Sequence, residues 1–369
     1  MRCLVLTPNR YGIREVAERV GAEWEAMGHD VEYGLARGDA ARMGPLTVGM
    51  PGIAAWWYRR LRQVAQDADR YDLVWAHQPF APTLPTRDPA FWERVVVTFH
   101  TTLRAEYELA RDGVYPARLR PYYWLMKTVE ARFYRGIEGL DGPGPQYTVV
   151  SPHLREEIAA FGIDEAAYVP NGLRTPDRDA FEPIRAEYGI PDNATLVFNL
   201  GSLTPQKRAP ECARLLRLVA DGADDIYCVM AGKGPLADAV GRHTTERMRW
   251  IGYVSEDAKW RWVHDADVFV SLSAYEGMPV AALEALSVGV PVVLSDIPAH
   301  RNVVDHHDTT GELVELTPAA IRAAVRQVAG RTADVQLPRW RDIAEDYLDV
   351  ARRATPGQSD DIGPDEMTK

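Results

Sequence analysis

The stretch DVFVSLSAYEGMPVAALEALSVGVPVVLSDIP, residues 267–298, decides the fold of this chain. It opens with a short run, 267–272, in which β-branched and aromatic residues are adjacent, and this predicts a buried strand. Apolar side chains then recur at helical spacing over 280–286, until Gly289 ends the predicted helix. Residues 291–294 predict a second strand. The pattern indicates a βαβ unit in a parallel sheet, where ligands bind beyond the carboxyl ends of the strands.

Two carboxylates belong to this unit. Glu276 lies in the loop before the predicted helix, and Glu284 lies inside the helix. A carboxylate accepts hydrogen bonds from two neighbouring hydroxyls, so one of the two suits a ribose and the other a hexose. Gly277 lets the backbone approach a ligand closely. The structural alternative is a glutamate near a helix start and an exposed glutamate on the helix.

The segment EGMPVAALE, residues 276–284, resembles the Glu-x7-Glu signature of family 4 glycosyltransferases, and ALSVGVPVV at 285–293 is similar to the family's continuation. The resemblance implies an α/β chain of GT-B architecture, with two facing Rossmann-like domains and a cleft between them. It also implies a retaining, metal-independent hexosyltransferase that needs no cofactor and uses a nucleotide sugar as co-substrate. The implied acceptor is a hydroxyl of a glycan or a lipid-linked molecule.

Length and composition agree with a two-domain globular protein. The chain has 369 residues, of which 46% are hydrophobic, and its net charge of −11 argues against a nucleic-acid partner. The three cysteines have no metal-type spacing, which fits a reducing cytoplasm. A predicted strand at 2–7 leaves no room for a signal peptide, and no apolar run is long enough to span a bilayer. We expect a cytoplasmic enzyme, at the inner face of the membrane if its acceptor is a lipid.

The first predicted domain, 1–180, begins with the strand 2–7 and a helix from about 13 to 27. In the resembled family the loop between them carries paired glycines near the donor phosphates. Only Gly12 remains here, preceded by Tyr11. Gly12 is therefore a candidate donor-binding residue through a tight turn.

Two histidines follow predicted strands of this domain. His77 ends the strand 71–76, and His100 ends the strand 94–99. Both are expected to face the cleft, with a structural role as the alternative. The sequence VTFHT at 97–101 resembles the family stretch whose histidine contacts the donor sugar or the acceptor. This favours His100 as the catalytic candidate.

The second predicted domain, 181–340, carries the sequence GSLTPQKR after its first strand at 195–200. The resembled family has an arginine directly after this glycine and a lysine five residues later, and both hold the diphosphate. The lysine matches Lys207, whereas Ser202 stands at the arginine position and Arg208 is a possible substitute. Cations here would stabilise charge on the leaving diphosphate without a metal ion.

Two further segments resemble donor contacts of the family. Gly232 begins a Gly-x-Gly-Pro turn, and Tyr253 lies in the short strand 250–254, where the family's backbone contacts the nucleotide base. The candidate catalytic residues are thus His100, Lys207 and Glu276. The candidate donor-binding residues are Gly12, Ser202, Lys207, Arg208, Gly232, Tyr253, Glu276, Gly277, Met278, Pro279, Val280 and Glu284.

Prolines place the hinge between the domains near 175–193. The predicted helix at about 343–353 is expected to cross back onto the first domain, and the polar segment 355–369 is expected to be disordered. Residues 104–135 carry seven Arg and Lys against four Asp and Glu, interleaved with aromatic residues. This segment is either a membrane or acceptor-headgroup surface or a solvated helix face with aromatic core anchors.

Two other functions remain open at this point. A nucleotide-sugar epimerase of GT-B architecture would need acid and base groups on both faces of the sugar, which the histidines do not clearly supply. A catalytically silent nucleotide-sugar-binding protein would be consistent with Ser202 and with the reduced glycine loop.

Overall fold

The computed structural model describes residues 1–7, 11–35, 42–43, 46–47, 49–173, 176–177, 181–306, 311–333, 335 and 337–353, and the structural statements below concern these residues. The predicted tail at 355–369 and part of the predicted hinge lie outside them. The boundaries of the two domains, 1–180 and 181–340, therefore remain predictions.

Six parallel strands form the first sheet, in the order β2-β1-β5-β6-β7-β8. Every residue of β5 and β6 is buried, as expected where helices cover both faces of a parallel sheet. Val5 of β1 lies between Tyr33 of β2 and Trp75 of β5. The strands are β1 (Arg2–Thr7), β2 (Asp30–Leu35), β5 (Leu73–His77), β6 (Val95–Phe99), β7 (Gln146–Val149) and β8 (Ala167–Tyr168).

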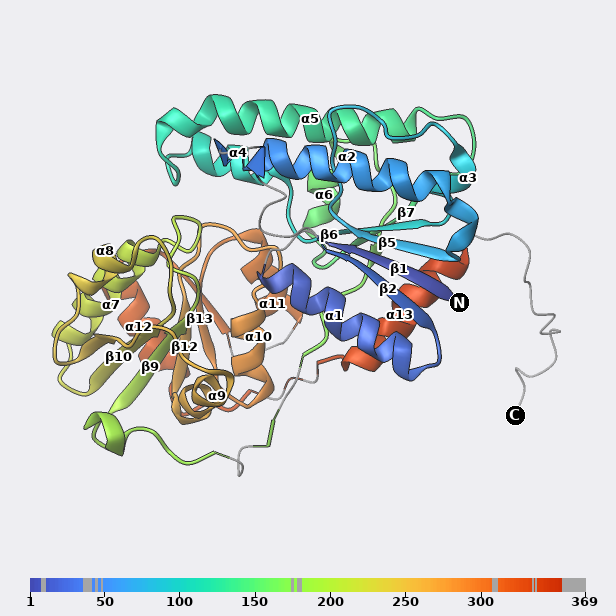
Figure 1. The fold of residues 1–369 in the computed structure, drawn as a ribbon. Helices are drawn as coiled ribbons and strands as arrows, with labels where there is room; N and C mark the ends of the chain where they lie inside the picture. The colour runs from blue at the N-terminus through green and yellow to red at the C-terminus, as the bar shows by residue number, and fades with distance from the viewer. Residues whose placement is uncertain are drawn as a thin grey trace.

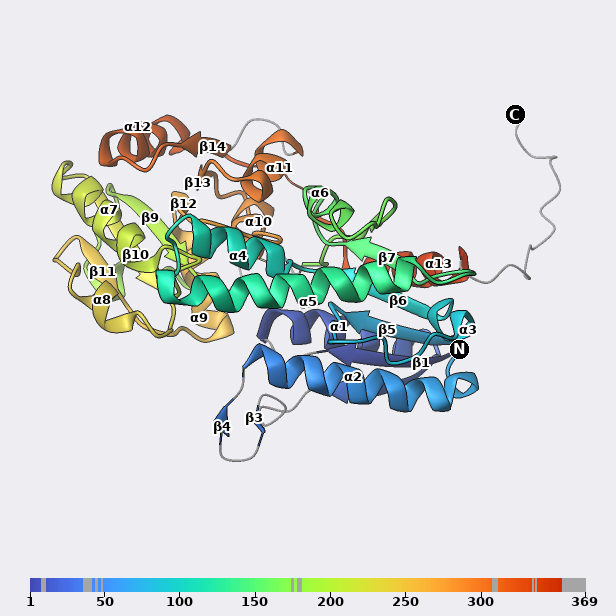
Figure 2. The same cartoon turned by 90° about the horizontal axis from the view of Figure 1, so that it is seen from above.

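Helices α2, α4 and α5 cover one face of this sheet, and α1 and α13 cover the other (Figure 1). The α4–α5 hairpin extends from the first domain over the second (Figures 1 and 2). The elements here are α1 (Tyr11–Ala26), β3 (Arg42–Met43), β4 (Leu46–Thr47), α2 (Met50–Gln66), η2 (Ala68–Arg70), α3 (Pro89–Trp92), α4 (Leu103–Arg111), η3 (Ala117–Leu119), α5 (Arg120–Glu138), α6 (Leu154–Ala159) and α13 (Trp340–Arg353).

Helix α13 comes from the end of the described chain and packs against α1. The Trp24 indole donates a hydrogen bond of 2.9 Å to the Ala344 carbonyl. The rings of Trp24 and Tyr347 both contact Trp75 of β5. This aromatic cluster places α13 in the same hydrophobic core as β1 and α1.

The second sheet also has six parallel strands, in the order β11-β10-β9-β12-β13-β14. The strand order reverses between β9 and β12, and open α/β sheets bind ligands at such a point. The strands are β9 (Thr195–Leu200), β10 (Ile226–Ala231), β11 (Met248–Trp250), β12 (Val268–Ser271), β13 (Val292–Ser295) and β14 (Gly311–Val314). The helices are η5 (Ala186–Tyr188), α7 (Ala209–Asp221), α8 (Ala237–Gly241), α9 (Glu256–Asp265), α10 (Val280–Ser287), α11 (Pro298–His306) and α12 (Pro318–Val328).

The start of one helix differs from the sequence prediction, and the start of another agrees with it. Helix α1 begins at Tyr11, so Gly12 lies inside the helix rather than in the loop before it. Helix α10 begins at Val280, and Pro279 is its N-cap because its ψ of 70° is not helical. No helix in the described ranges is long and apolar enough to cross a bilayer.

Candidate active site

The loop after β12 is the centre of the site, and side chains of the second domain hold it. The Ala274 amide donates to the Gln206 carbonyl over 2.8 Å, and the Gln206 amide nitrogen donates to the Tyr275 carbonyl over 3.2 Å. The Ser295 hydroxyl donates to the Ser273 carbonyl over 2.7 Å. These bonds place the next residue, the predicted catalytic glutamate, at the carboxyl edge of the second sheet.

The carboxylate of Glu276 pairs with the ammonium of Lys207. The Lys207 Nζ lies 2.6 and 2.5 Å from the two carboxylate oxygens, and the Ser273 hydroxyl donates to Oε1 over 2.7 Å. The Glu276 side chain is only 7% exposed, so it needs such partners, whereas the Lys207 side chain is 29% exposed. The structure thus brings two predicted catalytic residues into one ion pair.

His300 lies under this ion pair and was not predicted from the sequence. Its Nδ1 lies 2.8 Å from the Ser295 carbonyl oxygen, which can only accept, so Nδ1 carries the proton. Burial lowers the pKa of His300, although the nearby carboxylate of Glu276 opposes this shift. His300 is therefore a neutral neighbour of the ion pair.

A pocket opens beside the ion pair at the carboxyl ends of β9 and β12. The first turn of α10 forms one wall, and the amide groups of a first helical turn lack partners within the helix. We call this the donor pocket. Its lining contains the predicted residues Ser202, Lys207, Glu276, Pro279 and Val280, together with Asn199, Leu200, Gly201, Met230, Phe269, Ser271, Ser273, Ala281 and Ala282.

Gly232 closes the edge of the donor pocket through main-chain contacts. Its φ is +142°, and a Cβ at this position would lie 1.8 Å from the Gly201 carbonyl oxygen. Only glycine therefore fits. Nearby, Tyr253 is 59% exposed, and the Lys233 ammonium lies 4.3 Å from the centre of its ring. Tyr253 is thus open to solvent at the rim.

Arg208 and Glu284 contact other protein groups instead of lining the donor pocket. The Arg208 guanidinium donates over 3.2 Å to the carbonyl of Ser273, which lies in the loop 272–279 between β12 and α10; we call this loop the donor loop. The carboxylate of Glu284 lies 2.7 Å from the Lys259 ammonium, which also contacts Glu256. Burial raises the pKa of Glu284. The sequence analysis overlooked Lys259, which no local pattern connects to Glu284.

On the first domain, the rings of His100 and His77 pair with each other. His100 Nε2 and His77 Nδ1 lie 2.9 Å apart, and burial lowers the pKa of His100 to about 3 and that of His77 well below its usual value. Both rings are therefore neutral near pH 7. The main chain of His100 contacts the donor loop, because a Cβ on Gly277 would lie 1.7 Å from the His100 carbonyl oxygen.

The donor loop also reaches the first domain through Tyr275, which was not predicted. The Thr101 hydroxyl donates to the Tyr275 hydroxyl over 3.1 Å, and the Tyr275 hydroxyl donates to Glu157 over 3.3 Å. Burial raises the pKa of Glu157 to about 7. The main-chain N–H group of Asn171 also donates to the sulfur of Met278 over 3.3 Å. The polar residues directly after the strand ending at Phe99 were the signal that could have identified Thr101.

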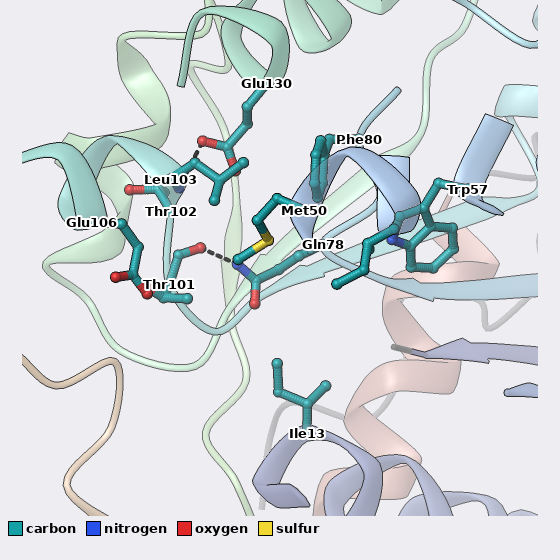
Figure 3. A pocket seen from close by; sticks show the side chains of 11 residues that line it. Ile13, Met50, Trp57, Gln78, Phe80, Thr101, Thr102, Leu103, Glu106 and Glu130 are labelled. Atoms are coloured by element: carbon teal, nitrogen blue, oxygen red, sulfur yellow. Dashed lines mark hydrogen bonds between the residues drawn. The ribbon is translucent and has the colours of Figure 1, made fainter. Parts of the chain in front are cut away.

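A second pocket lies on the first domain, and we call it the first-domain pocket. Thr101 lines it and also contacts Tyr275, so the pocket adjoins the donor loop. Gln78 has a φ of +50°, and its amide nitrogen donates to the Thr101 carbonyl (Figure 3). The lining residues are Ile13, Met50, Ile53, Trp57, Gln78, Phe80, Thr101, Thr102, Leu103, Glu106 and Glu130.

The described residues give no structural reason for a glycine at position 12 and contain no candidate metal site. A Cβ on Gly12 would meet nothing within 4 Å, so no described contact requires glycine there. Within the described ranges, no group of three or more His, Cys, Asp or Glu side chains is arranged to hold a metal ion.

Comparison with known proteins agrees with this two-sheet arrangement. Residues 11–176 match the family model described as Glycosyltransferase Family 4, and residues 180–330 match the one described as Glycosyl transferases group 1. The chain belongs to glycosyltransferase family 4. The family 4 enzyme is therefore a glycosyltransferase, as the Glu-x7-Glu pattern predicted.

Two relatives of the family 4 enzyme come from Mycobacterium tuberculosis. The GDP-mannose-dependent alpha-(1-6)-phosphatidylinositol dimannoside mannosyltransferase is 27% identical over 354 residues, which cover 88% of this chain and 85% of the relative. The phosphatidyl-myo-inositol mannosyltransferase is 26% identical over 330 residues, which cover 84% of this chain and 78% of the relative.

Solved structures of low sequence identity share the fold of the family 4 enzyme. Sucrose-phosphate synthase from Thermosynechococcus elongatus matches with a TM-score of 0.63 at 15% identity, over 96% of this chain and 99% of the other. WaaG, a glycosyltransferase involved in lipopolysaccharide biosynthesis, also matches with a TM-score of 0.63 at 15% identity. The match covers 97% of this chain and 96% of the WaaG chain. The prediction of GT-B architecture is confirmed.

Proposed function

We propose that this enzyme transfers a hexose from a nucleotide sugar to a hydroxyl of a lipid-linked acceptor, with retention of anomeric configuration and without a metal ion. The observation that carries the proposal is the ion pair of Lys207 and Glu276 beside the donor pocket. Relatives named as phosphatidylinositol-type mannosyltransferases, one of them GDP-mannose-dependent, support GDP-mannose as the donor.

The ion pair suits a site that exchanges partners when the donor binds. Each charge now compensates for the burial of the other. A diphosphate beside Lys207 and sugar hydroxyls beside Glu276 would give both groups new partners at little net cost in desolvation. Main-chain N–H groups in the first turn of α10 would donate further hydrogen bonds to the diphosphate. Lys207 and these amides would then stabilise the charge that develops on the leaving group.

The composition of the donor pocket supports retention by front-face attack. Retaining enzymes that form a covalent intermediate use a second carboxylate close to the first. The described lining of the donor pocket contains one carboxylate, that of Glu276. We therefore propose that the leaving phosphate oxygen accepts the proton of the acceptor hydroxyl. Neutral His100 would contact the transferred sugar from the other side of the cleft when the domains close.

The α4–α5 hairpin supports a membrane-bound acceptor and an enzyme that docks on the inner face of the membrane. Trp124 and Leu125 are 53% and 50% exposed in the first two turns of α5, whereas Phe133 and Tyr134 of the same helix are buried core anchors. The core-anchor interpretation therefore holds for the later turns of α5, and we propose the membrane-surface interpretation for its first two turns. A groove along the hairpin is lined by one anion, Glu108, and by four cations, Arg104, Lys127, Arg132 and Arg135. Exposed aromatic side chains beside cations are typical of surfaces that bind anionic membranes.

A donor screen followed by product analysis tests the proposal. Thermal shift with GDP-, UDP- and ADP-sugars should reveal one selective donor, because a ligand stabilises in proportion to its affinity. Transfer to extracted membrane lipids is then measured with and without EDTA, and NMR of the product gives the anomeric configuration. Inversion, dependence on a divalent metal, or donor binding without any transfer would each contradict part of the proposal. Donor binding without transfer would favour a catalytically silent nucleotide-sugar-binding protein. Conversion of the donor to an epimer would favour a nucleotide-sugar epimerase.

A further inference from the structure

The carboxyl group of Glu157, on α6, lies where the first domain contacts the donor loop. Its Oε2 accepts a hydrogen bond of 2.5 Å from the Thr102 hydroxyl and one of 3.3 Å from the Tyr275 hydroxyl. The Tyr275 hydroxyl accepts in turn from the Thr101 hydroxyl over 3.1 Å. Tyr275 directly precedes Glu276, which lines the donor pocket. Glu157 is thus connected, through one hydroxyl of the second domain, to the residue next to the predicted catalytic glutamate.

The first-domain side of this contact is fixed at the start of α4. The Thr102 hydroxyl accepts from the Ala105 amide over 3.0 Å as the N-cap of this helix, so its single proton is directed at Glu157. The next amide, that of Leu103, donates to the Glu130 carboxyl over 2.8 Å (Figure 3). The start of α4 is therefore held within the first domain, and Glu157 connects it to a loop of the second.

The groups around Glu157 do not compensate for a charge on it. Among the described residues, no Arg or Lys side chain forms an ion pair with this carboxyl, and Arg104 of α4 acts on it only at longer range. His153 of α6 lies 4.0 Å away, but burial lowers its pKa to about 4, so its ring is neutral near pH 7. Burial raises the pKa of Glu130 of α5 to about 8, which keeps most of it protonated. Glu106, the acid in the first turn of α4, instead accepts from a tyrosine of the hairpin.

The contact between the domains therefore depends on protonation of Glu157. Burial raises the pKa of this carboxyl to about 7, although hydrogen bonds from Thr102 and from the neutral Tyr275 hydroxyl oppose the shift. When the domains separate, Tyr275 leaves and water reaches the carboxyl, so its pKa falls toward the ordinary value of 4.5. The joined form thus binds a proton more tightly than the separated form. This advantage is complete below the pKa of the separated form and is lost as the pH rises through 7.

We propose that Glu157 is a positioning residue, which holds the donor loop against the first domain through Tyr275, and that its protonation favours closure of the two domains. When Glu157 is protonated, the domains meet without removing a charge from water. When it is ionised, closure desolvates an unpaired carboxylate, so the domains separate more readily. Transfer is thereby favoured at slightly acidic pH. The assignment rests on the proposed function, since it makes the loop part of the donor site.

Hydrogen exchange followed by mass spectrometry tests the proposal on the full chain without a donor. The amides observed are those of Gly277 in the donor loop and of Asn171, which donates to the sulfur of Met278. Their protection factors, corrected for the intrinsic pH dependence of exchange, are measured between pH 6 and pH 8. They should fall about tenfold more in the wild type than in Glu157→Gln, which is neutral throughout this range. Glu156→Gln, at the exposed neighbouring position of α6, is the matched control and should behave like the wild type.

An equal fall in the wild type and in Glu157→Gln overturns the proposal. Tyr275→Phe is a second test, which serves even if Glu157→Gln does not fold. Because it removes a donor to the ionised carboxylate, the midpoint of the pH transition in protection should move to higher pH. An unchanged midpoint contradicts the assignment. Exchange requires no donor, so failure of every nucleotide to bind counts against the proposed function alone.

Discussion

The ammonium of Lys207 lies 2.5 Å from the carboxylate of Glu276, and this contact joins residues that are 69 positions apart in the sequence. The carboxylate is almost completely buried, and a second bond comes from Ser273. Each partner of such a pair depends on the other, because an uncompensated buried charge is strongly destabilising. With the proposed function, a change at this pair should therefore affect stability and catalysis together.

Replacing one partner of this pair should affect stability and activity, whereas replacing both should affect activity alone. We expect Lys207→Met to lower the free energy of unfolding by roughly 1–3 kcal/mol, less than for a fully buried pair because Lys207 is partly exposed. The double variant Lys207→Met/Glu276→Gln should recover most of this loss but not kcat. Denaturant titration measures the free energy of unfolding and initial rates measure kcat, with Lys233→Met as the control variant. Full activity of the double variant would remove the pair from the reaction.

Glu284 should contribute to nucleotide affinity despite its contact with Lys259. Glu284→Ala should weaken binding of nucleotide and nucleotide sugar alike, by roughly 1.5–3 kcal/mol for a lost charged hydrogen bond. Calorimetry measures the affinities. Glu256→Ala is the matched control, since Glu256 contacts the same lysine but is mostly exposed. If both variants bind nucleotide like the wild type, Glu284 has a structural role only.

The hydroxyl of Tyr275 should assist catalysis by joining the donor loop to the first domain. Tyr275→Phe removes the bonds to Thr101 and Glu157 and keeps the ring. We expect kcat to fall by about tenfold, as for the loss of one or two hydrogen bonds, with little change in the KM for the donor. Tyr227→Phe, near the amino end of β10 and away from the donor pocket, is the control. A higher donor KM with unchanged kcat would place the effect in donor binding instead.

The histidine pair should make the folded protein sensitive to acid. The pKa of His100 is about 3 in the folded state and about 6.5 when unfolded, so the unfolded chain binds more protons between these values. The contribution of His100 to stability is thus complete above pH 6.5 and is lost as the pH falls toward 3. Urea titrations between pH 7.5 and 4.5 should show a weaker pH dependence for His100→Gln than for the wild type. Parallel pH profiles would contradict the burial of an uncharged ring.

The tip of the α4–α5 hairpin should carry membrane binding. Trp124→Ser/Leu125→Ser should reduce flotation with anionic liposomes, and added salt should weaken wild-type binding because it screens surface charge. Tyr168→Ser is the control, since Tyr168 is similarly exposed outside the hairpin. Absence of wild-type binding at low salt would indicate an acceptor that is not presented on an anionic membrane.

Local patterns in the sequence were sufficient for the fold and for part of the site. The 267–298 pattern predicted β12, α10 and β13, because strand and helix periods are properties of neighbouring residues. Glu276 was predicted from its place in the loop after a strand, since parallel strands end at the same edge of a sheet, whereas Lys207 was predicted only from the resemblance to the family.

Only the tertiary structure decided which side chains contact each other. Tyr275 and Thr101 are 174 positions apart, and they meet because the donor loop of one domain packs against a strand end of the other. Lys259 contacts Glu284 across two helices, and Glu157 meets Tyr275 only because α6 packs beside the donor loop. The local sequence determines secondary structure, but these contacts depend on the packing of distant elements, which no local period records.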